Sequence, residues 1–108
     1  MSNIRAEVIS KRYLRKVKIA NKYYSIYQAD RILDGKIEYD GVVSYPKRRI
    51  IIRKGRDFDV SLIHELLHCF IHEIYYKSKK KKYRLLCHDE YFIDNLTLLV
   101  NNMKGGKQ

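Results

Sequence analysis

The sequence H-E-x-x-H at residues 64–68 constrains this chain more than any other stretch. Residues four apart lie on one face of an α-helix, so His64 and His68 can bind one metal ion. Glu65 lies beside them, where a carboxylate can take a proton from a metal-bound water. Apolar residues recur at three-to-four spacing across Ser61–Tyr76 with no Gly or Pro. We therefore predict a helix that carries a metal site, and not a half-buried helix that carries histidines by chance.

The length of 108 residues predicts a single domain, 1–108, with one modest core. No apolar run approaches a membrane span and the N-terminus lacks a signal peptide, so we expect no membrane partner and a cytoplasmic protein. Two cysteines, Cys69 and Cys87, cannot form a disulfide framework and suit a reducing compartment.

The net charge is +11, from 23 Lys and Arg against 12 Asp and Glu. Such an excess attracts polyanions at low salt. The charge is spread over the whole chain and no nucleic-acid-binding motif accompanies it. We therefore interpret the excess charge as a general compositional bias of the protein. Nucleic acid is a possible partner, but it is not the favoured one.

The pattern of strands and helices predicts the α+β class. Three segments favour strands: Lys22–Ala29, Gly41–Tyr45 and Arg48–Lys54. They predict a small, twisted, mainly three-stranded sheet that packs on the motif helix. The first dozen residues favour a short N-terminal helix, although Tyr13 to Ile19 also alternates like a strand.

The C-terminal third contains a lysine run followed by a second amphipathic pattern. Like charges repel and stay solvated, which predicts a flexible basic loop at about 77–84. A second helix is expected from Asp89 or Glu90 to Met103, and a frayed tail at 104–108.

A catalytic zinc needs a third protein ligand and one open position. His72 lies about 12 Å along the helix axis from His64, too far to share the ion. The metzincin pattern is absent as well, since Ile71 and Ile74 hold the positions concerned. The third ligand must therefore come from another element. The second helix opens with Glu90 and Asp94, which are one turn apart on the same face.

H-E-x-x-H followed by a helix with E-x-x-x-D resembles the gluzincin metallopeptidases. The length and the order of strands, helix, loop and helix look most like the minigluzincins, which are small peptidases of the jannalysin and abylysin type. The resemblance covers Gly41 to Met103, and the N-terminal third by element order only. It implies one Zn²⁺ ion held by His64, His68 and Glu90, with Asp94 orienting His64 and Glu65 as general base.

The resemblance also implies hydrolysis of peptides or unfolded proteins, held along the edge of Gly41–Tyr45 or Arg48–Lys54. No obvious His or Tyr stabilises the oxyanion, and the candidates near in sequence are Tyr83, His88 and Tyr91. A protein this small would have a shallow cleft. Its tail, or that of a neighbour in a homo-oligomer, could occupy the cleft and keep the enzyme latent.

Two other functions remain open from the residues. In the first, the protein is a nucleic-acid-associated zinc protease or regulator whose lysine loop docks on phosphates. In the second, it is a non-catalytic zinc-stabilised module. Cys87 and His88 would then complete a closed site with His64 and His68, leaving no open position.

Overall fold

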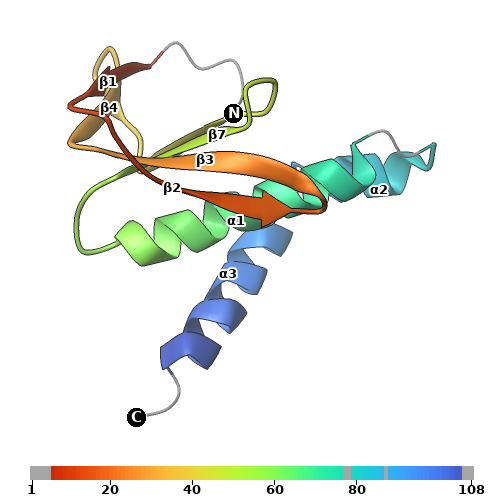
Figure 1. The fold of residues 1–108 in the computed structure, drawn as a ribbon. Helices are drawn as coiled ribbons and strands as arrows, with labels where there is room; N and C mark the ends of the chain where they lie inside the picture. Colours follow the sequence, from red (N-terminus) through yellow and green to blue (C-terminus); the bar gives the residue numbers. More distant parts are fainter. Residues whose placement is uncertain (1–5, 77–78, 87, 106–108) are drawn as a thin grey trace.

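The computed structural model describes residues 6–76, 79–86 and 88–105, and it confirms the α+β class (Figure 1). Within these residues, seven strands come first and three helices follow. The strands are β1 (Glu7–Ile9), β2 (Arg12–Ile19), β3 (Lys22–Ala29), β4 (Arg31–Asp34), β5 (Ile37–Glu38), β6 (Gly41–Ser44) and β7 (Arg49–Arg53). The helices are α1 (Phe58–Tyr75), α2 (Lys81–Leu86) and α3 (Glu90–Gly105).

The strands form two sheets, a four-stranded sheet in the order β2-β3-β7-β6 and a three-stranded sheet in the order β1-β4-β5. In the larger sheet, β2 pairs with β3 and β6 pairs with β7, both in antiparallel orientation. The central strands β3 and β7 run parallel to each other. The predicted strand at Lys22–Ala29 is confirmed, and those near residues 41–45 and 48–54 are confirmed with ends shifted by one residue. The sheet against the motif helix has four strands, because β2 adds one to the three predicted.

The predicted N-terminal helix is wrong for the described residues, since β1 and β2 occupy this region. Ser10, between them, has a φ of 56°, which ends regular pairing and turns the chain. β2 then pairs with β3 from Arg12 to Ile19. On β2, Val17 and Ile19 contact the core while Lys16 and Lys18 are exposed. The side chains therefore alternate with the two-residue period of a strand, and not with that of a helix. Residues 1–5 of the prediction lie outside the described residues.

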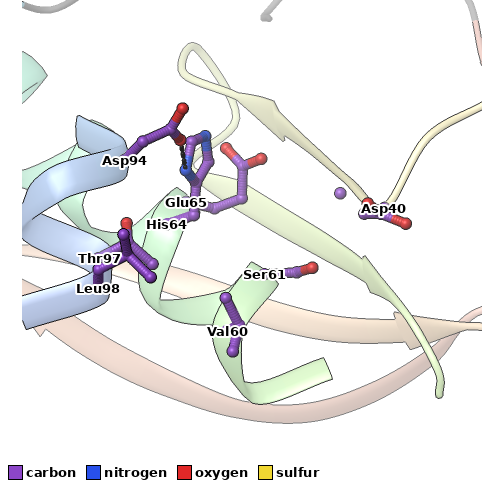
Figure 2. A pocket seen from close by; sticks show the side chains of 9 residues that line it. Asp40, Val60, Ser61, His64, Glu65, Asp94, Thr97 and Leu98 are labelled. Atoms are coloured by element: carbon purple, nitrogen blue, oxygen red, sulfur yellow. Dashed lines mark ion pairs between the residues drawn. The ribbon is translucent and has the colours of Figure 1, made fainter. Parts of the chain in front are cut away.

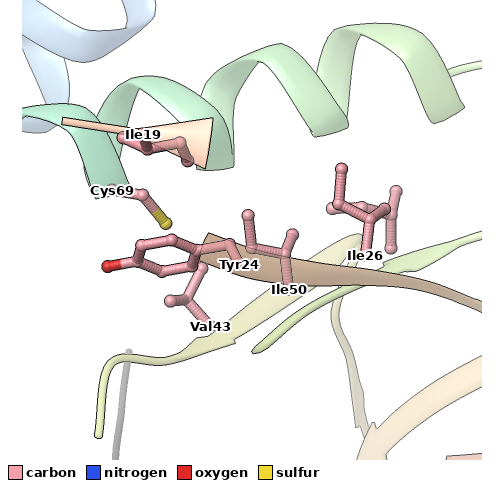
Figure 3. Close-up of a cluster of buried hydrophobic side chains, with 7 residues drawn as sticks. Ile19, Tyr24, Ile26, Val43, Ile50 and Cys69 are labelled. Atoms are coloured by element: carbon pink, nitrogen blue, oxygen red, sulfur yellow. The ribbon is translucent and has the colours of Figure 1, made fainter. Parts of the chain in front are cut away.

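The main core lies between α1 and one face of the four-stranded sheet (Figure 3). The sheet contributes the buried side chains Ile19, Tyr24, Ile26, Val43, Ile50 and Ile52. On the helix side, Cys69 is fully buried, and Phe58, Leu62 and Leu66 pack against the same cluster. Because these helix positions recur at three-to-four spacing, one stripe of α1 is fixed on the sheet.

The lysine-rich segment differs from the predicted loop at 77–84. Lys81–Leu86 forms α2, residues 79 and 80 form a bend, and residues 77 and 78 lie outside the described residues. Lysine and leucine are good helix formers, and Leu86 packs against the buried pair Ile71 and Ile93. The backbone of α3 continues to Gly105, into the predicted tail, and residues 106–108 are not described.

Across the described parts of the chain, the helices lack the combination of length and hydropathy needed to cross a membrane.

Ile50→Ala should destabilise the protein by about 2–5 kcal/mol, because Ile50 is fully buried between α1 and the sheet. The control is Ile37→Ala, whose side chain is 58% exposed on β5 and which should change stability by about 0.5 kcal/mol or less. Urea unfolding of both variants measures the difference. Equal losses would show that this cluster is not the main core.

Candidate metal centre

The candidate site lies where the middle of α1 meets the start of α3. Ile71 of α1 and Ile93 of α3 are both buried at this contact. Leu67 and Tyr75 stand one turn before and after Ile71, so a second stripe of α1 faces α3. α1 is therefore packed on the sheet along one stripe and on α3 along another. This double contact fixes the helix that carries the H-E-x-x-H motif.

The start of α3 is fixed by Asp89. The backbone N–H of Phe92 donates to Asp89 Oδ1 at 3.1 Å, and the N–H of Ile93 donates to the Asp89 carbonyl oxygen at 3.0 Å. An aspartate that accepts these bonds is a strong helix N-cap. Because α3 begins there, Glu90 lies in its first turn and Asp94 follows one turn later on the same face.

Three side chains converge between the helices. His64 Nε2 and His68 Nε2 are 3.2 Å apart. Glu90 Oε1 lies 3.3 Å from His64 Nε2 and 3.2 Å from His68 Nε2. Two ligands bound at about 2.0–2.1 Å to a tetrahedral ion stand about 3.3 Å apart. The donor atoms therefore have the spacing that a single small metal ion requires, and this group could bind one.

Asp94 contacts the other nitrogen of the first histidine. His64 Nδ1 and Asp94 Oδ1 are 3.2 Å apart, as the dashed line in Figure 2 marks. When Nδ1–H donates to this carboxylate, the lone pair of His64 lies on Nε2, which faces His68 and Glu90. Such a carboxylate fixes the tautomer and raises the basicity of a metal-binding imidazole. Asp94 is therefore placed to orient His64.

The Glu65 carboxyl lies beside the cluster, at the edge of the sheet. Its desolvation by burial raises its pKa, and the neighbouring His64 acts in the opposite direction. A Cβ atom at Gly41 would stand 2.9 Å from Ile52 Cδ1 and 3.3 Å from Glu65 Oε2. A side chain at this position would force Ile52 Cδ1 to shift and would press on Glu65, so glycine allows the two elements to approach closely. In the sequence, Gly41 is the first residue of the predicted strand Gly41–Tyr45, and a glycine at the start of a strand is the available signal for such a contact.

A cleft of about 510 Å³ opens at this point (Figure 2). Its lining residues are Asp40, Gly41, Val60, Ser61, His64, Glu65, Asp94, Thr97 and Leu98. From the sequence, His64, Glu65 and Asp94 were predicted for the site and Gly41 belonged to a candidate substrate-binding strand, but the other lining residues were not singled out. They come together only through the packing of α1, α3 and β6. The cleft gives a bound molecule access to His64 and Glu65 at once.

His72 is not part of the cluster, as its distance along the helix predicted. Its ring stacks on Tyr45, with centroids 3.9 Å apart, and on Tyr76, at 4.4 Å. Burial lowers the pKa of the His72 imidazole. This histidine has a packing role between β6–β7 and the end of α1.

Three residues were considered for oxyanion stabilisation. The two whose side chains the structure describes, His88 and Tyr91, do not line the cleft. Tyr91 is 81% exposed on α3, and His88 is exposed in the turn before it. Side-chain contacts of Tyr83, and all of Cys87, fall outside the described residues. Among the residues that the structure describes, the possible metal ligands that come together are His64, His68 and Glu90, without His88.

Comparisons of this chain with protein-family models, with curated proteins and with solved structures found no match. Membership of the minigluzincins therefore stays a prediction from the motif and the element order.

Proposed function

We propose that this chain is a zinc-dependent metallopeptidase of the gluzincin type. The observation that supports it best is the convergence of His64 Nε2, His68 Nε2 and the Glu90 carboxylate at mutual distances of 3.2–3.3 Å. Two imidazoles and one carboxylate are a ligand set of catalytic zinc sites, which keep the fourth position open. Structural zinc sites usually have four protein ligands.

The residues around the cluster fit the roles that peptide hydrolysis needs. Zinc, when bound, would lower the pKa of a water molecule and polarise a carbonyl group. Glu65 would take a proton from that water and pass it to the leaving amine. Burial supports this role, because the raised pKa of the Glu65 carboxyl brings it closer to the operating pH of a general base.

The edge strand β6 is the proposed binding surface for the substrate. Of the two strands considered from the sequence, β7 lies inside the sheet between β3 and β6, so its edges are paired. Among the described strands, β6 pairs with β7 alone. Gly41, at the start of β6, lines the cleft beside Glu65. An extended peptide added to β6 would bring its backbone to the Glu65 carboxyl.

Glu90→Ala should largely remove zinc, because it leaves two protein ligands. Asp94→Ala should keep zinc at saturating metal while affinity or activity falls about 10–100-fold, since Asp94 acts through His64. His88→Ala is the control and should bind zinc as the native chain does. Competition with a chromophoric chelator measures all three affinities. If His88→Ala loses zinc while Glu90→Ala keeps it, the ligand set is wrong.

Glu65→Gln should retain zinc and lose hydrolysis by several orders of magnitude, because the amide cannot accept the proton. Metal content and cleavage of an unstructured peptide are measured on the same samples. A variant that cleaves at the native rate would refute the role of Glu65. A native chain that holds zinc and cleaves no unstructured substrate would instead favour the non-catalytic zinc module.

Gly41→Ala should lower kcat at least about 10-fold, because the added Cβ must displace Ile52 or the Glu65 side chain. Zinc affinity should not change, as Gly41 touches none of the three ligands. Ser44→Ala, at the other end of β6, is the matched control and should retain native kcat. Native kcat in a folded Gly41→Ala variant would show that Glu65 needs no such positioning.

A further inference from the structure

The four-stranded sheet has a second face, turned away from α1. Along β3, Tyr24 and Ile26 point into the core, so Tyr23, Ser25 and Tyr27 point to the opposite side. The neighbouring residues on this side follow from the register of β2 and β7. We use the name tyrosine face for Tyr13, Lys16, Lys18, Tyr23, Ser25, Tyr27 and Arg49.

The register gives this face a regular arrangement. Lys18 pairs with Tyr23, and Tyr13 pairs with Tyr27. Between the two tyrosines of β3 lies Ser25, with Lys16 beside it on β2 and Arg49 beside it on β7. Tyrosines therefore flank the small Ser25 along the strand, and cations flank it across the sheet.

The tyrosines are partly held in place by their neighbours. The rings of Tyr13 and Tyr27 meet edge to face, with centroids 5.6 Å apart. Lys11 Nζ lies 4.9 Å from the Tyr27 ring centre, and Lys18 Nζ lies 5.9 Å from that of Tyr23. Even so, Tyr23 is 61% exposed and Tyr13 is 52% exposed. These rings offer accessible aromatic surface beside positive charge.

Strands β2, β3, β6 and β7 contain no Asp or Glu. Within the described residues, no carboxylate forms an ion pair with Lys16, Lys18 or Arg49, all of which are exposed. By contrast, Arg31 pairs with Glu38. The positive charge looked evenly spread in the sequence, but unpaired cations gather here.

A groove of about 420 Å³ adjoins the tyrosine face. Arg49 belongs to both surfaces. Lys11 and Lys47 also line the groove, and Val8, Val42 and Ile51 give it apolar walls. A flexible polyanion that lies across the tyrosine face at Ser25 can therefore continue past Arg49 into a groove that is also lined by cations.

We propose that the tyrosine face binds single-stranded nucleic acid. Such ligands are held by aromatic rings that stack on bases and by a cationic track that contacts phosphates. The two exposed rings are those of Tyr23 and Tyr13. Because Tyr13 pairs with Tyr27, four residues from Tyr23, they stand about 13 Å apart along the strands and can stack on different bases of one nucleic-acid strand. A duplex hides its bases from such rings, and an acidic protein would use the cations without the tyrosines. The proposal is independent of zinc, because α1 and the metal centre lie on the other face of the sheet.

The test is fluorescence anisotropy of labelled dodecamers, oligothymidylate and oligouridylate, against a duplex of equal length. The native chain should bind at least one single strand more tightly than the duplex at equal salt. Tyr23→Ala should weaken single-strand binding about 5–100-fold, and Tyr23→Phe should restore it, because phenylalanine also stacks. Tyr91→Ala, which removes an even more exposed tyrosine from α3, is the control and should bind as the native chain does.

The cations are tested through salt dependence. Replacing Lys16 and Arg49 together by Gln should reduce the slope of log K against log salt by about 1.4, which corresponds to two phosphate contacts on a single strand. Lys36→Gln, in the turn after β4, should leave the slope unchanged. Native binding by Tyr23→Ala, equal affinity for the duplex or for polyglutamate, or no binding at low salt would each overturn the proposal. Glu65→Gln should bind the strands normally, which separates this test from that of hydrolysis.

Discussion

The contact between Ile71 of α1 and Ile93 of α3 is the interaction on which the candidate site depends. H-E-x-x-H brings only two imidazoles together, whatever the rest of the chain does. The third group comes from Glu90, 22 residues after His68 in the chain. Burial of the two isoleucines sets α3 against α1, and the Asp89 cap sets where α3 starts. These two features together place Glu90 and Asp94 against the two edges of the His64 imidazole.

The sheet makes a separate contribution to the site. Core packing holds α1 on the sheet through Cys69 and its neighbours, and this brings Glu65 to the start of β6. There the carboxyl is buried against Gly41, and its pKa rises because solvation of its charge is lost. The metal ligands depend on α1 and α3, whereas the proposed base depends on α1 and β6. The two halves of the site can therefore be perturbed separately. For this reason, substitution of Gly41 should change kcat, whereas substitution of Glu90 should change zinc binding.

Local periodicity made part of this structure predictable. The strand at Lys22–Ala29 and the positions of His64 and His68 on one helix follow from spacing within a single element. The separation of His72 from the cluster follows in the same way. By contrast, the N-terminal residues fit both helix and strand patterns, and pairing of β2 with β3 decided between them. That choice depends on partners far along the chain, which a single-segment pattern does not contain.

The least predictable features are those set by register. The approach of Gly41 to Glu65 requires the order β7-β6 and the packing of α1 on it. The tyrosine face likewise exists only because β2, β3 and β7 align Lys16, Ser25 and Arg49 in one row. In the sequence these residues belong to three separate segments with ordinary basic composition. The positive charge resembled a general bias of the sequence, and strand pairing shows that part of it is gathered on one face of the sheet.

The central claim is that zinc is held by two histidines and one carboxylate with one position open. X-ray absorption spectroscopy of the zinc-loaded chain tests it most directly, because Zn–S bonds of about 2.3 Å are distinct from Zn–N and Zn–O bonds of about 2.0–2.2 Å. The account predicts nitrogen and oxygen ligands only, with two imidazoles and one exchangeable water. A sulfur ligand, or four protein ligands without water, would contradict it and indicate the closed structural site.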